Sequence, residues 1–453
     1  MTDLTNKKQE IPDFETPKEF TSSMEYLRHL ALEGLKNRIE VLTDTLEKRL
    51  EHELDIISKL DAEVDVSNYL LIVADYINWA RKNDIPVGPG RGTSTSSLVC
   101  YALSITDIIP TDFGLIFELF INPERKVLPD IDIDFSIDGR ELVVDYIAEK
   151  YGKNRVGLIA AYGIKKGKVS YVSTHACGVI ISKKDLSDYV PVLRLEYSDL
   201  HVCQYDSSEI ANYGLVKFDI LGLKTLDIMQ KCKEIIRKKE GQFAAFSISD
   251  IPFNDKITFE LFCRGDTDGI YQFEFEGIKD ELQQLQPDCF FDLVNLYALY
   301  RLGLMDKMPL YIERKNGKQA IEYPHPCLEN ILKDTYGIIL YQEQIMQIFC
   351  ELTFYSFAQA NYLRSDLMKS DVLDIESIKS DFCSHTKFDS KEAGRLFDIL
   401  YNAVNTTSNT YFKSHAIPYV KLGYQTAYLK ANFPDEFKSA LESTRIFLGK
   451  NDF

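Results

Sequence analysis

The segment Pro129-Asp-Ile-Asp-Ile-Asp-Phe135 places aspartates at every second position of a short apolar stretch. Side chains alternate between the two faces of a β-strand, so a strand here would carry Asp130, Asp132 and Asp134 on one face. Like charges within about 7 Å repel one another unless cations lie among them. The pattern therefore predicts a hard-cation site for Mg²⁺. Solvated strand-end acids or helix caps are the alternative, and they would suffice for a single Asp-x-Asp.

A second apolar segment, Val216-Lys-Phe-Asp-Ile220, offers one more acid, Asp219, in a strand-like setting. Acids from two strands can hold two metal ions about 3.5–4 Å apart, an arrangement suited to in-line phosphoryl transfer. The two segments together predict a two-metal centre on one sheet.

A glycine-rich stretch at 88–97 precedes a helix that opens at Leu98. Backbone N–H groups at a helix N-terminus, together with hydroxyls and Arg91, favour a phosphate-binding turn. The stretch is not a Walker A loop, because the Lys-Ser/Thr pair is missing. A plain turn with Ser/Thr capping fits the same residues.

Composition limits the possible functions. The 453 residues allow two to four domains, and 45% hydrophobic with 27% charged residues indicates a folded protein. The 69 acids and 52 bases give a net charge of −17, which excludes a uniformly basic nucleic-acid coat. A nucleic-acid role would need local basic patches or bound metal cations.

The cellular compartment is predicted from three features that we do not find in the sequence: a membrane helix, a signal peptide and paired cysteines. No apolar run approaches the roughly 20 residues of a membrane helix, and the start Met1-Thr-Asp-Leu4 has no signal-peptide pattern. The nine cysteines are scattered without a Cys-x-x-Cys pair, which disfavours a disulfide framework or zinc site. We expect a cytoplasmic protein without a membrane partner.

Periodicity predicts the elements. Helices are expected at 23–59, 65–82 and 139–151, and strands within 125–135 and at 155–161, 178–182 and 215–221. The chain is mostly helical from about 225. The fold class is α+β, a small mixed sheet with flanking helices followed by a helical domain.

Several motifs occur in a fixed order that resembles one family, the alpha subunits of bacterial DNA polymerase III, which are C-family replicative polymerases. The resemblance runs from about residue 10 to 445. The motifs are Val87-Gly-Pro-Gly-Arg-Gly92, Asn122-Pro-Glu-Arg125, the aspartate segment 129–135, His175-Ala-Cys-Gly-Val-Ile-Ile-Ser182, Gly214-Leu-Val-Lys-Phe-Asp-Ile-Leu-Gly222, Thr335-Tyr-Gly337, Tyr341-Gln-Glu-Gln344, Lys413-Ser-His415 and Tyr424-Gln-Thr-Ala-Tyr-Leu-Lys430.

This resemblance implies a nucleotidyltransferase-like palm and a helical fingers domain. It implies a DNA-directed DNA polymerase (a transferase of DNA replication) that extends a primer by a two-metal mechanism with two Mg²⁺ ions. Primer–template DNA and deoxynucleoside triphosphates would be partners, with other replisome subunits possible. The domains expected are a linker at 1–22, the palm at 23–224, the fingers at 225–445 and a tail at 446–453.

The resemblance also assigns residues. The catalytic, metal-binding acids fall on Asp132, Asp134 and Asp219, with Asp130 as a structural acid beside them. The residues placed at the nucleotide are Arg91, Gly92, Thr93, Arg125, Arg364, Lys369, Lys413 and His415.

The chain departs from the family pattern in several places. Set against the family pattern, we expect neither a PHP domain nor the family's C-terminal regions in this sequence, and we expect no thumb, because Tyr162 and His175 are only 13 residues apart. Residues 163–174 are therefore expected to form a short basic connection. The family pattern leads us to expect basic residues where this chain has Leu119 and the pair Ser365-Asp366. The Arg-Pro-Gly-Pro motif of the family reads Arg301-Leu-Gly-Leu304 here.

Two alternatives follow. One is a truncated, catalytically weak or inactive relative that keeps the fold and a metal or nucleic-acid site. The other, an unrelated metal-dependent transferase that holds a nucleotide sugar, is disfavoured by the ordered motifs.

Overall fold

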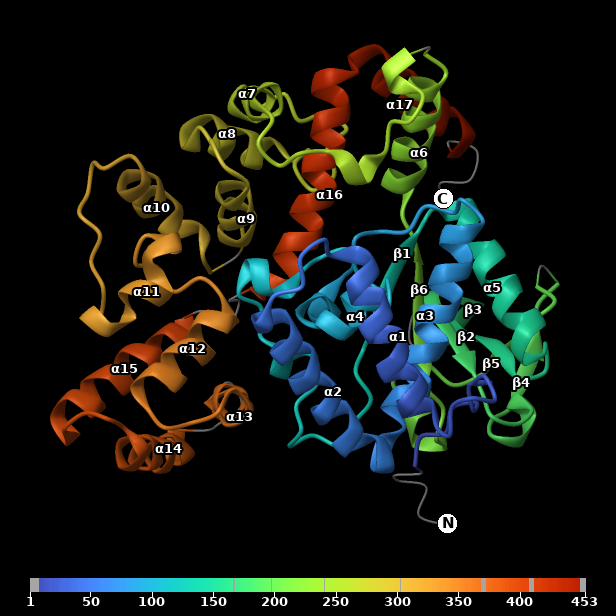
Figure 1. Ribbon diagram of the computed structural model, residues 1–453, viewed down its shortest axis with the longest axis horizontal. Helices are drawn as coiled ribbons and strands as arrows, with labels where there is room; N and C mark the ends of the chain where they lie inside the picture. The colour runs from blue at the N-terminus through green and yellow to red at the C-terminus, as the bar shows by residue number, and fades with distance from the viewer. Residues whose placement is uncertain are drawn as a thin grey trace. The chain divides into compact units, whose positions relative to one another are not determined.

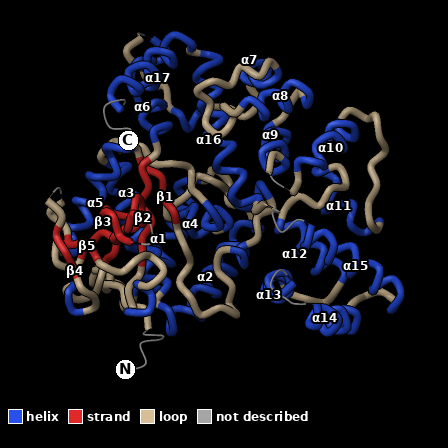
Figure 2. Tube along the Cα trace, turned by 180° about the vertical axis from the view of Figure 1, so that it is seen from behind, coloured by secondary structure: helices blue, strands red, loops and turns tan. Residues whose placement is uncertain are grey.

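The computed structural model describes residues 8–165, 168–196, 198–239, 241–301, 303–367, 372–406 and 411–448. The chain divides into two compact units, which we call the first unit (1–113 with 125–230) and the second unit (114–124 with 231–453). All six strands belong to the first unit, and the second is built from helices (Figures 1 and 2). The predicted α+β class is therefore confirmed. Among the described residues, no helix is both long and apolar enough to cross a membrane.

One mixed sheet forms the centre of the first unit. Its order is β1-β6-β3-β2-β5-β4, with parallel pairing in β1·β6 and β2·β5 and antiparallel pairing elsewhere. The strands are β1 (Asp132–Phe135), β2 (Val156–Lys165), β3 (Lys168–Ile181), β4 (Val192–Arg194), β5 (His201–Cys203) and β6 (Lys217–Gly222). The sheet thus brings the two predicted acid-bearing strands, β1 and β6, side by side although the chain separates them widely.

The helices of the first unit are α1 (Ser23–Arg38), α2 (Asp44–Val64), α3 (Val66–Lys82), α4 (Leu98–Ala102) and α5 (Ile137–Tyr151), and α6 (Lys224–Arg237) leads on to the second. The single helix predicted at 23–59 is wrong, because the chain breaks between α1 and α2. The Thr43 hydroxyl accepts the N–H of Leu46 at 3.4 Å and so starts a new helix.

Packing on the sheet sets which way the acids face. From α3, the rings of Tyr69 and Tyr76 contact Phe218 and Phe135 with centroids 5.2 and 6.3 Å apart. Burying each such ring stabilises the fold by roughly 1.5–3 kcal/mol. Phe218 is next to Asp219 in β6, so alternation directs that carboxylate to the face opposite α3.

The segment expected as a basic connection is a β-hairpin instead. β2 and β3 pair from Tyr162↔Val172 out to Lys165↔Lys168, and the two tip residues, 166 and 167, lie outside the described residues. The correction has a physical reason: residues 169–174 read Val-Ser-Tyr-Val-Ser-Thr, and β-branched and aromatic residues favour a pleated strand.

Residues 8–22, expected to be a linker, pack along the first unit. The N–H of Glu10 donates to the carbonyl of Gly214 at 2.8 Å, and the N–H of Phe14 donates to Oδ1 of Asn68 at 2.9 Å. Ile11 is buried. The segment therefore ties α3 to the stretch that leads into β6.

The second unit is helical as predicted, and a large core cluster lies among α12–α15. Residues 114–124 join this unit, because Ile116 is buried in that cluster and the Asn361 amide donates to the carbonyl of Glu118 at 2.9 Å. The helices are α7 (Lys256–Cys263), α8 (Glu276–Leu285), α9 (Phe290–Leu299), α10 (Met308–Lys315), α11 (Glu329–Leu332), α12 (Gln342–Leu352), α13 (Phe357–Leu367), α14 (Val372–His385), α15 (Ser390–Thr406), α16 (Lys413–Asn432) and α17 (Pro434–Leu448).

Candidate metal centre

Three carboxylates meet where β1 and β6 run parallel. Asp132 stands opposite Asp219 in the strand register, and Asp130 precedes β1. Ligand oxygens of these three residues all lie within 4.8 Å of one another. We call Asp130, Asp132 and Asp219 the acid cluster.

Asp134 lies beside the acid cluster and has its own partner. Its register partner, Leu221, places it on the same sheet face as Asp132 and Asp219. The Arg91 guanidinium donates to Oδ1 of Asp134 at 3.2 Å, and its Nε lies 3.8 Å from Oδ2 of Asp132. Arg91 therefore bridges the cluster and the fourth acid.

Lys217 supplies a second cation. It precedes Asp219 by two positions, so alternation puts both side chains on one face, and its Nζ lies 2.5 Å from Oδ2 of Asp219. Lys217 lies in the predicted acid-bearing segment, but no role was predicted for it. The lysine two residues before a strand acid was the signal that could have identified it.

Burial, together with the charges of neighbouring acids, raises the pKa values in the acid cluster. Burial raises the pKa of Asp132 to about 6, assisted by the charges of Asp130 and Asp219 and opposed by Arg91 and Lys217. Burial and the Asp219 charge likewise raise the pKa of Asp130. The cations on hand thus leave the cluster with uncompensated negative charge. Hard oxygen donors with unmet negative charge suit Mg²⁺, so the residues present fit the ion.

A bulge in β3 lies next to the acid cluster, because Gly178 pairs with Asp219. Leu158 pairs with Val179 but Ala160 pairs with Thr174, so extra residues of β3 loop out, and the Gly178 N–H donates to Nδ1 of His175 at 3.0 Å. Gly178 pairs with Asp219. A Cβ on this glycine would lie 2.6 Å from Cδ1 of Ile159, which explains the glycine in the His-Ala-Cys-Gly motif.

The glycine-rich loop packs against β1. The Gly88 N–H donates to the Asp134 carbonyl at 2.8 Å, and Gly92 and Thr93 open a 3₁₀ turn at Gly92–Ser96. Gly92 has φ +69°, a left-handed value that glycine adopts without strain. The loop therefore sits beside the acid-bearing strand as a phosphate role requires.

The backbone N–H groups at the start of α4, directly after this loop, already donate to a side chain. The buried Glu53 carboxylate accepts the N–H groups of Leu98 and Val99 at 2.9 and 3.0 Å and the Ser97 hydroxyl at 2.8 Å. The expectation that the first turn of α4 binds phosphate is therefore wrong, because these donors are used and a carboxylate would repel the anion. No sequence pattern marks Glu53, which lies 45 residues before Leu98.

The remaining predicted nucleotide residues lie elsewhere in the chain. Arg125 is in an exposed loop of the first unit, whereas Arg364, Lys413 and His415 belong to the second unit. Lys369 lies outside the described residues.

Arg364 and Lys413 both make hydrogen bonds to other residues of the second unit. Arg364 is buried and its guanidinium donates to Gln342 and, at 2.9 Å, to Oδ1 of Asn361. Lys413 starts α16, where its N–H donates to the buried Glu343 at 2.9 Å. Burial lowers the pKa of the Lys413 ammonium, and Glu343 opposes that change.

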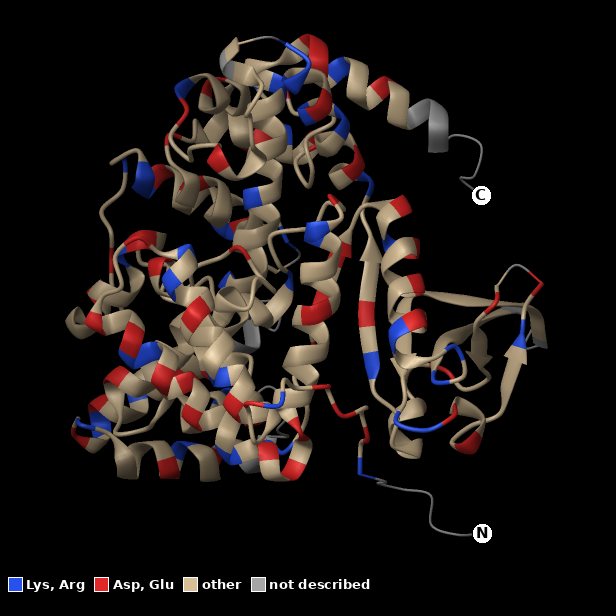
Figure 3. Ribbon diagram, turned by 45° about the vertical axis from the view of Figure 1, so that its right-hand side comes forward, with Lys and Arg blue, Asp and Glu red and all other residues tan. Residues whose placement is uncertain are grey.

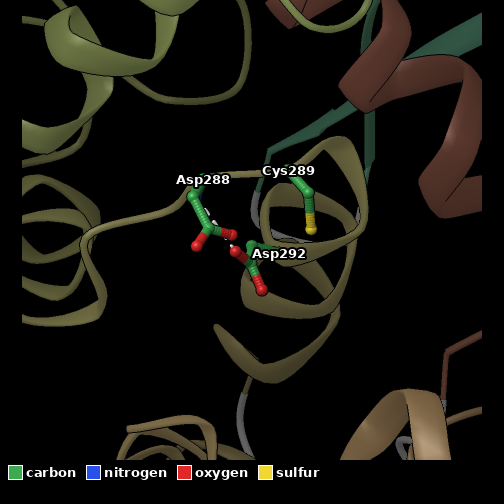
Figure 4. A group of neighbouring side chains, drawn as sticks. All are labelled: Asp288, Cys289 and Asp292. Carbon is green, nitrogen blue, oxygen red and sulfur yellow. Dashed lines mark hydrogen bonds between the residues drawn. The ribbon is translucent and has the colours of Figure 1, made fainter.

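A second group of possible ligands lies in the second unit (Figure 4). Ligand atoms of Asp288, Cys289 and Asp292 are within 4.8 Å of one another. The Lys315 ammonium pairs with Asp292 at 2.8 Å and Asp288 at 3.2 Å, and the Asp288 N–H donates to Asp292 at 3.1 Å. This group therefore surrounds an ion pair with Lys315 at the start of α9, and we assign it no metal.

Two protein-family models match this chain. Residues 25–171 and 165–222 match the family described as the bacterial DNA polymerase III alpha NTPase domain, and residues 225–389 match the bacterial DNA polymerase III alpha subunit finger domain. The two matched segments of the first family overlap in the β2–β3 hairpin.

The chain is also similar to curated proteins named DNA polymerase III subunit alpha. The Treponema pallidum protein is 36% identical over 96% of this chain and 42% of its own length. The Borreliella burgdorferi protein is 36% identical over 95% of this chain and 42% of its own length, and the Pseudomonas aeruginosa protein 35% over 95% and 44%. The chain spans less than half the length of these relatives.

Proposed function

Because the chain belongs to the family of bacterial DNA polymerase III alpha subunits, we propose that it adds deoxynucleotides to a primer 3′-hydroxyl as a DNA-directed DNA polymerase of replication. The observation that carries this proposal is the acid cluster, formed by strands from two separate motifs. Primer–template DNA and deoxynucleoside triphosphates are the proposed substrates, in the cytoplasm, with other replisome subunits as possible partners.

The acids are proposed to hold two Mg²⁺ ions. Asp132 and Asp219 face each other across the parallel strands, with Asp130 in the cluster and Asp134 on the same face. Mg²⁺ bound there supplies the Lewis acidity and positive charge that attack of a hydroxyl on a triphosphate requires. The protein fixes the carboxylates by the strand register and by the aromatic packing of α3 on the opposite face.

The loop residues are proposed to bind the triphosphate. Gly92 and Thr93 lie next to β1 in a tight turn, and Arg91 already points at the acids. Arg125, Arg364, Lys369, Lys413 and His415 remain proposed nucleotide residues on the strength of the family resemblance. Charge-assisted contacts from such residues are the strongest available to phosphate.

A catalytically weak relative is the second candidate, and three observations favour it. Leu119, at a position expected to be basic, packs against the core cluster of the second unit. Arg364 is bonded to Gln342 and Asn361. The β2–β3 hairpin is paired as far as Lys165↔Lys168, where the family resemblance leads one to expect a thumb.

Primer extension with Mg²⁺ tests the proposal. A 5′-labelled primer on a template should be extended by the chain, and Asp132→Asn should reduce the rate at least a hundredfold. Asp145→Asn is the matched control, because Asp145 is an exposed acid on α5 of the same unit. Absence of extension with retained, Asp132-dependent Mn²⁺ binding would favour the weak relative. Equal extension by the Asp132 variant would refute the catalytic assignment.

A further inference from the structure

The ion pair between Lys217 and Asp219 lies inside the proposed metal centre. The side chain of Asp219 is only 6% exposed, and the Lys217 ammonium occupies one of its two oxygens at 2.5 Å. The lysine stem passes over the β3 bulge, where its Cδ would lie 3.4 Å from a Cβ on Gly178. The ammonium thus reaches Asp219 along the same face of the sheet that carries the acid cluster.

From this geometry we infer that Lys217 acts as a resident cation, so that the Lys217–Asp219 ion pair and a divalent metal ion at Asp219 exclude each other. The inference rests on the proposed function, because it names the group that regulates access to the same metal centre. Lys217 is a positioning residue in this scheme, since it acts on the metal through Asp219.

Exclusion follows from distance and charge. A Mg²⁺ ion needs its carboxylate oxygens at about 2.0–2.1 Å, and an ammonium on the same oxygen would face a double positive charge only a few ångströms away. The two cations therefore compete for Oδ2 of Asp219. Lysine suits a displaceable role, because its charge sits on a flexible stem and can move away intact.

Arg91, the other cation at these acids, contacts Asp132 and Asp134 of β1. Its guanidinium lies 3.2 Å from Asp134 and 3.8 Å from Asp132. Lys217 is the cation on Oδ2 of Asp219, so metal entry at this oxygen requires the lysine to move. The consequence is a metal affinity set by Lys217 rather than by the acids alone.

Mn²⁺ binding to the full chain, measured from the loss of the free-ion electron paramagnetic resonance signal, tests the inference. Lys217→Gln should bind Mn²⁺ about tenfold more tightly, whereas Lys217→Arg, which keeps the charge, should remain near the unmodified chain. Lys150→Gln is the matched control: Lys150 pairs with Asp75 at 2.7 Å in the same unit, and its side chain, like that of Lys217, is 30% exposed. Unchanged or weaker Mn²⁺ binding by folded Lys217→Gln would overturn the inference.

The unmodified chain gives a second, independent measurement. Lysine acetylation read by mass spectrometry should rise several-fold at Lys217 when Mn²⁺ is added, because the ammonium then leaves its ion pair with Asp219 and enters solvent. Lys150 should react equally with and without the ion. Equal or slower acetylation of Lys217 in Mn²⁺ would contradict displacement, even if the Lys217→Gln variant failed to fold.

These outcomes separate the inference from the polymerase proposal. Tighter Mn²⁺ binding by Lys217→Gln together with no primer extension would support the resident cation and count against catalysis. Primer extension together with weaker Mn²⁺ binding by Lys217→Gln would support catalysis and refute the resident cation.

Discussion

At the scale of single residues, neighbouring positions of a strand have different roles, because their side chains lie on opposite faces of the sheet. Phe218 packs on Tyr69 under the sheet, and Asp219 joins the acid cluster above it. The same alternation serves β1, where buried Ile133 lies between Asp132 and Asp134. Burial of the apolar neighbour thus positions the carboxylate, and a shift of one residue in register would exchange the two roles.

The crowded Asp132 carboxylate predicts a pH dependence of stability without metal. Its folded pKa of about 6 lies above the ordinary value near 3.9, so its contribution is fully present below about pH 4 and is lost as pH rises through 6. In a chelator, the unfolding free energy of the unmodified chain relative to Asp132→Asn should fall by about 1 kcal/mol from pH 5 to pH 7.5. Urea unfolding at both pH values measures this difference. A constant difference would mean that neither burial nor the neighbouring acids raise the pKa of Asp132 in the folded chain.

The residues that the sequence could identify are those set by local pattern. Alternation placed Asp132 and Asp219 on strands because both segments are short, apolar and self-contained. Lys217 is marked only by its place two residues before Asp219, and Glu53 carries no such mark, since it gains its role from a partner that folding supplies. Glu53 contacts a helix start 45 positions away, and a local pattern holds no information on such a contact.

At the scale of elements, Glu53 joins α2 to the start of α4 behind the glycine-rich loop. It accepts two backbone N–H groups, and Nε of Arg49 donates to it at 2.6 Å. Glu53→Ala would leave these donors and the Arg49 charge without their partner, so we expect a loss of about 3–5 kcal/mol in unfolding free energy. Urea unfolding measures the loss.

Glu51→Ala on the same helix is its control. Glu51 pairs with Arg28, its side chain is 50% exposed, and exposed pairs contribute about 0–1 kcal/mol. Similar losses in the two variants would show that Glu53 is not a cap.

The β3 bulge makes a second prediction at this scale. Gly178→Ala forces a Cβ to 2.6 Å from the buried Ile159 and should cost about 1–3 kcal/mol in unfolding free energy. Gly222→Ala in β6 should cost little, because its Cβ would meet its nearest neighbour at an ordinary 3.5 Å. Thermal unfolding of both variants measures the contrast. Equal midpoints would show that the bulge relaxes freely.

Element prediction succeeded where periodicity was long or strong and failed at interruptions. α3 was expected at 65–82 and runs over Val66–Lys82. The break between α1 and α2 was missed because apolar spacing continues through it while Thr43 caps a new helix. β4 and β5 are three residues each, too short for a pattern, and the β2–β3 hairpin was underestimated because its lysines suggested a loop.

At the scale of the whole molecule, the charge is spread rather than segregated. Acidic and basic side chains are interspersed along the helices of both units (Figure 3). A chain with net charge −17 gains no general attraction for DNA, so binding must depend on local cations. In the proposed function, metal ions held at the acid cluster supply that local positive charge.

Metal binding should therefore stabilise the two units unequally. An ion that binds only the folded state adds RT ln(1 + [L]/Kd), about 2.7 kcal/mol at a hundredfold excess over Kd. Mg²⁺ should slow amide hydrogen exchange in β1 and β6, which carry the acid cluster, and leave α9 unchanged. The reason is that Asp288 and Asp292 already have Lys315 as their cation.

Hydrogen exchange followed by mass spectrometry, with and without Mg²⁺, gives protection for each segment. Asp219→Asn should abolish the Mg²⁺ effect on β1 and β6, because it removes a cluster carboxylate without changing side-chain volume. Asp288→Asn is the matched control, since this acid is 80% exposed and belongs to the other acidic group. Protection of β1 and β6 that survived Asp219→Asn would show that Asp219 is not a ligand. An Mg²⁺ effect that vanished in Asp288→Asn would move the metal site to the second unit.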